Sequence, residues 1–203
     1  MSRHGVGDGT RVVLYAKDRV SWATRVWWQL RRFGFDAAAV LDGGWEGWVG
    51  GGRSVSRTPD SYPPARFEAR SRPELIVTTA EVEAALGTDN ACLVNALSHD
   101  QHTGAAELHD GRPGQIPGSV NLPYLDLFDP EIGTFLPLAE LRERLGRAGL
   151  LGARRVVSYC GGGIGATAVA FALALVGRED VAVYDGSMLE WAADPARQIE
   201  RGG

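Results

Sequence analysis

The chain has 203 residues, of which 44% are hydrophobic and 23% are charged, and its net charge at pH 7 is −4. This length and composition allow one or two domains with a packed core, and the mildly acidic balance argues against a general nucleic-acid-binding protein. No apolar run approaches the roughly 20 residues of a membrane-spanning helix, so no membrane contact is expected. With two cysteines and no secretory leader at the N-terminus, the sequence predicts a cytoplasmic protein without a disulfide framework.

Residues 11–48 have the pattern of a strand, a helix and a second strand. Residues 12–15 and 38–41 are short apolar runs of the buried-strand type, and residues 22–33 have helical length and periodicity. Gly34 follows the helix where a C-cap glycine belongs. This order predicts a βαβ unit with two parallel strands.

Residues 53–74 are rich in Gly, Ser, Pro and Arg, a composition typical of an interdomain linker. Beyond them we expect a short strand at Ile76-Val77, a helix over residues 79–86 with Thr79 as its N-cap, and a strand over residues 91–96 that holds Cys92 in the core. A further helix is expected over residues 138–148.

Three histidines, His99, His102 and His109, fall in the predicted loop after that strand. A metal site is conceivable there, but no cysteine cluster accompanies the histidines. We therefore predict solvated loop histidines and no metal site.

Residues 155–191 repeat the pattern of residues 11–48. Strands are expected at residues 156–159 and 181–184 with a helix over residues 166–176 between them, and both copies end in a matching Asp-Gly turn followed by a tryptophan. We interpret the similarity as an internal duplication.

Because few residues precede the first copy and many precede the second, the first domain is expected to lack its N-terminal half. We predict a partial, inactive domain over residues 1–52, a linker over 53–74 and a complete α/β domain over 75–203, with a parallel sheet covered by helices on both faces. The partial domain should then pack against residues 75–200 or form a homodimer.

The stretch YCGGGIGAT, residues 159–167, places Cys160 between a strand and a small-residue helix. Glycines let successive backbone N–H groups turn toward one point, and a helix N-terminus adds unpaired N–H groups and a positive dipole end. Such a cradle favours a thiolate over a thiol. The alternative is a buried cysteine beside a flexible turn. In the first copy the matching residue is Ala16, with no glycines after it, and this contrast favours one working site.

The residues that follow Cys160 argue against a cysteine phosphatase. Such enzymes carry an arginine that clamps phosphate at the position held here by Ala166. No Arg or Lys occurs from Gly161 to Phe171, so a phosphate dianion would lack its clamp.

Four stretches together resemble the two-domain rhodanese-type sulfurtransferases of the thiosulfate and 3-mercaptopyruvate group. They are RVWWQLRRFGFDAAAVLDGGWEGW, GRPGQIPGSVNLPY, YCGGGIGAT and VAVYDGSMLEW. The resemblance implies a rhodanese-like fold in which an inactive domain precedes a catalytic one, with the site at their interface. It also implies that Cys160 takes up a sulfane sulfur as a persulfide and passes it to a thiol or cyanide acceptor, without a cofactor.

The resemblance implies the remaining site residues too. The loop residues Gly161, Gly162, Gly163, Ile164 and Gly165 would bind the donor. This loop is similar to that of mercaptopyruvate-preferring members, with Gly162 in place of a serine and Gly165 in place of a threonine.

Arg112 matches one of two arginines that hold the mercaptopyruvate carboxylate, while Gln101 stands in place of the other. The family's Asp-x-Arg motif is replaced by residues 95–97, Asn-Ala-Leu. The donor is thus left open between thiosulfate and 3-mercaptopyruvate. The alternative function is a catalytically weak, truncated sulfur-carrier or binding module. Ser187 either lines the site or stabilises a turn.

Overall fold

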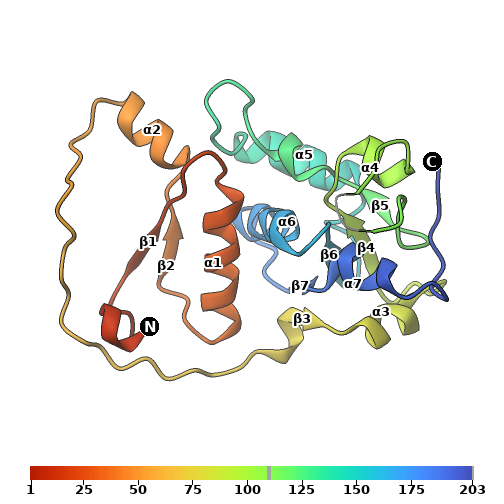
Figure 1. Ribbon diagram of the computed structural model, residues 1–203, viewed down its shortest axis with the longest axis horizontal. Helices are drawn as coiled ribbons and strands as arrows, with labels where there is room; N and C mark the ends of the chain where they lie inside the picture. Colours follow the sequence, from red (N-terminus) through yellow and green to blue (C-terminus); the bar gives the residue numbers. More distant parts are fainter. Residues whose placement is uncertain (109–110, 203) are drawn as a thin grey trace.

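The computed structural model describes residues 1–108 and 111–202, which form two α/β units joined by a long connecting segment (Figure 1). The first unit has a two-stranded parallel sheet of β1 (Val12–Leu14) and β2 (Ala38–Val40), with helix α1 (Ser21–Arg32) between them and helix α2 (Gly44–Gly50) after them.

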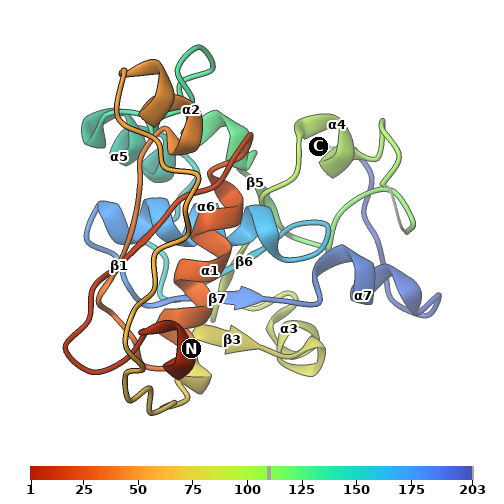
Figure 2. The same cartoon turned by 60° about the vertical axis from the view of Figure 1, so that its left-hand side comes forward.

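The second unit is built on a five-stranded parallel sheet in the order β3-β7-β6-β4-β5, so the expected parallel α/β fold is confirmed. Figure 2 shows β3, β7 and β6 side by side. The strands are β3 (Ile76–Val77), β4 (Cys92–Asn95), β5 (Val120–Asn121), β6 (Val156–Tyr159) and β7 (Val181–Tyr184). The helices are α3 (Thr79–Ala85), α4 (His99–Thr103), α5 (Leu138–Arg147), α6 (Ile164–Leu175) and α7 (Ser187–Ala193). Within the described ranges, no helix is long and apolar enough to cross a membrane.

The central strand β6 is buried on both faces, which explains why its sequence, VVSY, has no charged residue and no apolar–polar alternation. Val156 contributes to a core with α5, α6 and α1, whereas Val157 contributes to a second core with α3 and α7. The two side chains are 0% and 3% exposed. Because β6 is the middle strand of the sheet and is buried on both faces, its carboxyl end lies at the centre of the second unit. Cys160 directly follows this end.

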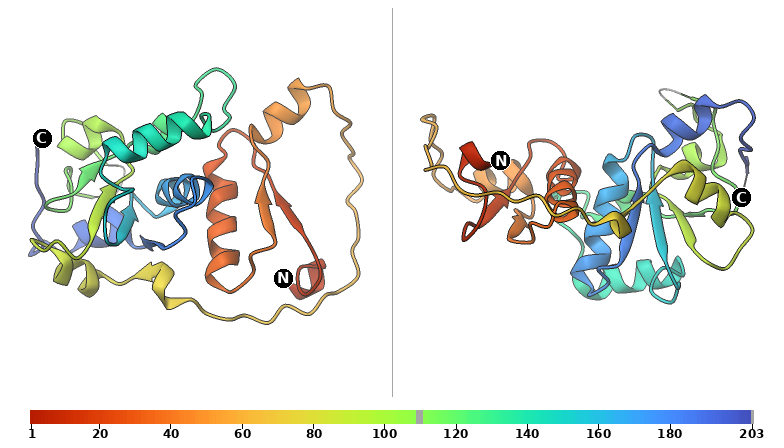
Figure 3. Two further views of the ribbon diagram at one scale, coloured as in Figure 1. Left: turned by 180° about the vertical axis from the view of Figure 1, so that it is seen from behind. Right: turned by 90° about the horizontal axis from the view of Figure 1, so that it is seen from below.

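The first unit packs against the second through α1 and α6, which lie side by side in the views of Figures 1 and 3. Both helices have 12 residues, and their fourth residues, Thr24 and Thr167, share a hydrogen bond of 3.1 Å between fully buried hydroxyl groups. Trp28 is 1% exposed, and the ring of Trp27 meets that of Phe171 edge to face at 4.8 Å. We expected the first unit either to pack against residues 75–200 or to form a homodimer, and the structure shows packing against the second unit.

The connecting segment over residues 53–72 contains no helix or strand and runs around the outside of the molecule (Figures 1 and 3). Near its end, the backbone N–H of Arg72 donates to the Arg32 carbonyl at 2.8 Å, and its guanidinium donates to both carboxylate oxygens of Asp36 at 2.6 Å. The guanidinium lowers the pKa of Asp36. The segment is therefore anchored to the first unit before β3 begins.

Three local expectations are corrected by the structure. The N-cap of α3 is Thr78 and not Thr79, because Thr78 and Glu81 exchange the two hydrogen bonds of a capping box. The segment expected as a histidine loop forms α4, which buries His102, while His99 is exposed. His109 lies outside the described residues. The near-helical spacing of Trp22, Trp27 and Trp28 predicts that all three are core or interface residues, but this is wrong for Trp22, whose side chain is 53% exposed.

We expect Trp28→Ala to lower the free energy of unfolding by about 3–5 kcal/mol, because it leaves a cavity between α1 and the second unit. Urea unfolding of the full chain measures this change. Trp22→Ala on the same helix is the matched control and should change stability by less than about 1 kcal/mol, since Trp22 faces solvent. Equal losses in the two variants would show that the packing of α1 on α6 does not stabilise the chain.

Candidate active site

Cys160 lies directly after β6 and four residues before the start of α6. Its side chain is 5% exposed and belongs to the core that α6 helps to form. The first backbone N–H groups of a helix lack partners within that helix, and together with the helix dipole they favour negative charge nearby. The first turn of α6 carries no acidic residue that would oppose this effect. The position is suited to a thiolate.

The segment after β7 holds the backbone of the Cys160 loop. The Cys160 N–H donates to Ser187 Oγ at 3.1 Å, and the carbonyl of Cys160 accepts from the Met188 N–H at 3.0 Å. The Gly161 carbonyl accepts from the Leu189 N–H at 2.9 Å. Ser187 adopts a left-handed conformation, with φ of 51°, and its hydroxyl donates to the Tyr184 carbonyl. Ser187 is fully buried and does not line the cavity, so its hydroxyl stabilises the turn after β7 and ties that turn to the backbone of Cys160.

At two positions of the loop, neighbouring atoms leave no space for a Cβ, so only glycine fits. Gly163 caps α6 with φ of 82°, and a Cβ there would come within 2.7 Å of the Asp185 carboxylate. A Cβ on Gly165 would come within 2.7 Å of the Tyr124 ring. Tyr124 therefore occupies the space that a larger side chain at position 165 would need. Gly162, by contrast, faces open space.

A cavity of about 210 Å³ lies beside the loop. Gly161 and Gly162 form one wall, and the remaining lining residues are Leu97, Gln101, Leu108, Met188 and Leu189. Among the residues that the structure describes, the lining is apolar except for the Gln101 amide. Gly163, Ile164 and Gly165 instead form the cap and first residues of α6.

Arg112 is not among the residues that line this cavity. Its guanidinium donates to three backbone carbonyls, those of Ala192 at 3.1 Å, Asp194 at 2.8 Å and Arg197 at 2.9 Å. These bonds anchor the segment after α7. The structure therefore places Gly161 and Gly162, which directly follow Cys160, at the cavity, but neither the Cys160 side chain nor Arg112 is among the lining residues.

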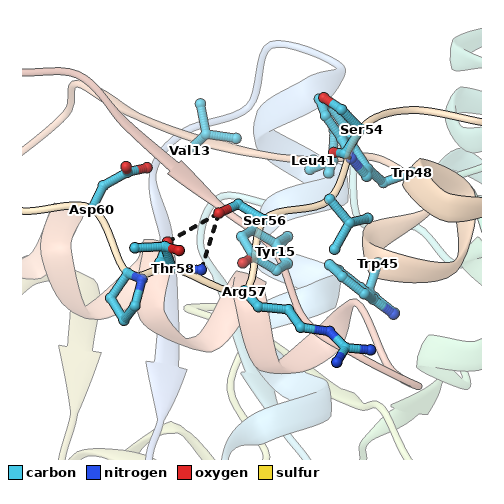
Figure 4. A pocket seen from close by; sticks show the side chains of 12 residues that line it. Val13, Tyr15, Leu41, Trp45, Trp48, Ser54, Ser56, Arg57, Thr58 and Asp60 are labelled. Carbon is cyan, nitrogen blue, oxygen red and sulfur yellow. Dashed lines mark hydrogen bonds between the residues drawn. The ribbon is translucent and has the colours of Figure 1, made fainter.

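The first unit contains an equivalent loop without a thiol. There the carbonyl of Ala16 accepts from the Trp45 N–H at 3.0 Å, as the carbonyl of Cys160 accepts from Met188. A cavity of about 650 Å³ lies on this unit, over its sheet, and Figure 4 shows Tyr15 and Trp45 beside residues 54–60. It is larger than the cavity beside Gly161 and Gly162, and among the described residues neither cavity has a cysteine or a histidine in its lining. The smaller cavity is the candidate site because it borders the loop that follows Cys160.

His102 is buried on α4, next to Gln101 of the cavity. Burial lowers the pKa of its imidazole, and the neighbouring His99 lowers it further against the opposite effect of Glu200. No group of three or more metal-ligating side chains occurs in the part of the chain that the structure describes. His102 is thus a core residue whose burial disfavours the charged form of its imidazole.

Sequence reasoning found part of this site. Leu97 and Gln101 were noted because they replace residues of the family motif, and both line the cavity. Leu108, Met188 and Leu189 were missed because single apolar residues carry no signal of chemistry. The Asp-Gly-Ser turn after β7 is the sequence feature that could have indicated Met188 and Leu189, because they directly follow it. The same turn does not predict whether Ser187 lines the cavity or stabilises the turn.

The fold and the site define a class: a parallel α/β protein with a cysteine in a glycine loop between the central strand and a helix N-terminus. The comparison with family models agrees, because the model described as Rhodanese-like domain matches residues 2–50 and 78–194. The chain belongs to the rhodanese-like domain family.

Curated relatives cover almost the whole chain. The human 3-mercaptopyruvate sulfurtransferase is 35% identical over 193 residues, which are 93% of this chain and 65% of the relative. The probable 3-mercaptopyruvate sulfurtransferase of Pseudomonas aeruginosa is 33% identical over 98% of this chain and 70% of its own length. The bovine thiosulfate sulfurtransferase is 32% identical, with 98% and 69% covered. The chain thus spans about two thirds of the length of these relatives.

Solved structures share the fold over the whole chain. The anaerobic ergothioneine biosynthesis enzyme of Chlorobium limicola, in complex with trimethyl histidine, has a TM-score of 0.86 at 24% identity. The alignment covers 100% of this chain and 53% of that one. At this identity the similarity supports the arrangement of both units and says nothing about substrates.

We expect Gly165→Ala to destabilise the chain by about 1–3 kcal/mol, because the added methyl group overlaps the Tyr124 ring at the start of α6. Gly162→Ala, which meets open space, is the matched control and should change the free energy of unfolding by less than about 0.5 kcal/mol. Thermal and urea unfolding of both variants check this difference. Adding Tyr124→Leu to Gly165→Ala should relieve part of the overlap, and a double variant that is fully additive would contradict the proposed contact.

Proposed function

We propose that this protein is a sulfurtransferase that carries a sulfane sulfur on Cys160. The observation that carries the proposal is the position of the thiol, held in a glycine loop at the N-terminus of α6 beside a cavity. The names of the relatives support the same reaction type. Both the reaction and its substrates are proposals for this chain, since it spans 65% of the human relative.

In the first step, the Cys160 thiolate attacks the outer sulfur atom of thiosulfate or the thiol sulfur atom of 3-mercaptopyruvate. With thiosulfate, the bond between its two sulfur atoms breaks and sulfite leaves with the electron pair. With 3-mercaptopyruvate, the carbon–sulfur bond breaks and the electron pair leaves on an enolate of pyruvate, which takes up a proton. Either donor leaves a persulfide on Cys160.

In the second step, an acceptor thiolate or cyanide attacks the terminal sulfur of the persulfide. The bond between the two sulfur atoms breaks, and Cys160 leaves as a thiolate. The N–H groups at the start of α6 stabilise this thiolate in both steps. The loop residues 161–165 surround the transferred sulfur, and the cycle needs no metal or cofactor.

The second candidate is a sulfur carrier or binding module that accepts sulfur without fast turnover. Gly162 and Gly165 leave the loop without the serine and threonine hydroxyl groups expected from the family resemblance, which favours the carrier. The Tyr124 ring occupies the space that a threonine at position 165 would need. The two candidates differ in whether the persulfide, once formed, is passed on rapidly to a small thiol.

The test of the function is persulfide formation on the full chain. After incubation with thiosulfate or 3-mercaptopyruvate, mass spectrometry should show one added sulfur atom on the peptide that contains Cys160. A small thiol should then remove this sulfur. Cys160→Ser should abolish the mass change, whereas Cys92→Ser is the matched control and should retain it. Sulfur found equally on Cys92 would contradict the proposal, and a persulfide that is stable to the thiol would favour the carrier.

Arg112 can be tested separately as a ligand of the donor carboxylate. Loss of such a ligand should raise KM for 3-mercaptopyruvate by one to two orders of magnitude, the scale of a charged hydrogen bond at about 1.5–3 kcal/mol. Because three carbonyls already hold the guanidinium, we expect Arg112→Ala to lower the melting temperature and to leave KM for both donors within about threefold. A large rise in KM for 3-mercaptopyruvate alone would establish the carboxylate contact.

A further inference from the structure

Arg25 reaches from the first unit to the loop that carries Cys160. It lies on α1, and its guanidinium forms an ion pair with Asp185 and donates to the Gly163 carbonyl at 3.4 Å. The same guanidinium lies over the Trp28 ring, 5.4 Å from its centroid. The side chain is 22% exposed, so these partners and not solvent surround most of it.

Both partners of Arg25 belong to the frame of the loop. Gly163 is the left-handed residue that turns the chain into α6, and a Cβ there would come within 3.0 Å of the Arg25 guanidinium. Asp185 is two residues before Ser187, whose hydroxyl accepts the N–H of Cys160. One side chain of the first unit therefore contacts the end of the loop and the segment that holds its beginning.

We propose that Arg25 is a positioning residue for Cys160. It contacts neither the cavity nor the thiol but keeps Gly163 and Asp185 at a fixed separation, so that the thiol stays at the N-terminus of α6. Both contacts come from the Nη1 atom of Arg25, while the guanidinium plane lies over the Trp28 ring. A lysine ammonium has neither this plane nor its fixed orientation. The first unit, which has no thiol at Ala16, thereby contributes to the site of the second.

The inference rests on the proposed function only in taking Cys160 as the reactive thiol. The ion pair between Arg25 and Asp185 could also serve only to hold the two units together. The test therefore needs, as a control, a second ion pair between the units that does not involve the loop. Arg31 provides it: it lies on the same helix, donates to the Glu179 carboxylate of the second unit at 2.7 Å, and lies over the Trp27 ring at 5.7 Å. In the described residues, the hydrogen bonds and ion pairs of Arg31 go to Glu179 and Asp36, neither of which belongs to the loop.

The experiment measures the rate of alkylation of Cys160 by iodoacetamide in the full chain, read by mass spectrometry. We expect Arg25→Met to slow this reaction about tenfold, because a small displacement of a reacting group is costly. Arg25→Lys should recover part of the rate. Arg31→Met is the matched control. Its Cys160 should be alkylated at a rate within about twofold of that in the unaltered chain, even if its melting temperature falls as far as that of Arg25→Met.

A second readout uses sulfur transfer. At saturating donor, Arg25→Met should lower the rate of persulfide formation, while KM for the donor stays unchanged because Arg25 does not line the cavity. If Arg25→Met does not fold, Asp185→Asn replaces it, since that change removes the ion pair and keeps the size of the side chain. The same loss of rate is then expected.

The outcomes separate the two proposals. Cys92 is the more accessible thiol, but burial raises its pKa, so the proposed function predicts faster alkylation of Cys160. If Cys160 of the unaltered chain reacts no faster than Cys92, the proposed function fails. If Cys160 reacts faster but Arg25→Met matches the unaltered chain, or slows no more than Arg31→Met, only the positioning role is overturned.

Discussion

Helix α6 is apolar around its whole circumference, and the arrangement of both units follows from the need to cover it. Its sequence, IGATAVAFALAL, contains no charged residue, and eight of its residues are buried. The sheet covers one side and α1 covers the other, with the Thr24–Thr167 hydrogen bond satisfying the two polar groups between them. Because α6 also begins at the Cys160 loop, the contact that buries the helix also brings the first unit next to the site.

The loop itself depends on the absence of side chains. Gly163 needs a left-handed backbone where the Asp185 carboxylate leaves no space for a Cβ, and Gly165 lies against the Tyr124 ring. Ser187 accepts a left-handed conformation to present its hydroxyl to the Cys160 N–H. The equivalent loop of the first unit keeps a similar backbone contact at Ala16 but has neither the thiol nor the glycines. The candidate thiol is thus found in one of two similar loops and not in the other.

The first unit exposes positions that the second unit buries. Tyr15 and Val13 are 60% and 63% exposed, while the matching residues of β6, Tyr159 and Val157, are 0% and 3% exposed. In the second unit, β3, α3 and β4 border and cover the corresponding strands. An apolar sheet face without such a cover is prone to association. The stability of the first unit in this chain therefore depends on α1 and its contact with α6.

The sequence by itself determined the class of fold, the positions of the main strands and the candidate nucleophile. Apolar runs at residues 156–159 and 181–184, and the glycines after Cys160, carry these signals locally, because periodicity and backbone freedom are properties of neighbouring residues. Arg112 also carried a motif signal, yet its guanidinium lies on carbonyls of the C-terminal segment. The helix at residues 99–103 and the burial of His102 were missed for the same reason that short helices often are: packing, and not local pattern, stabilises them.

Only the tertiary structure decided which side chains surround the loop. The cavity is lined by residues from α4, from the segment before β5 and from α7, which are far apart along the chain. The contact of Arg25 with Asp185 joins residues separated by 160 positions. Contacts of this kind leave no periodic trace in a sequence, because they depend on how α1 packs against α6 and on where the strands end in space.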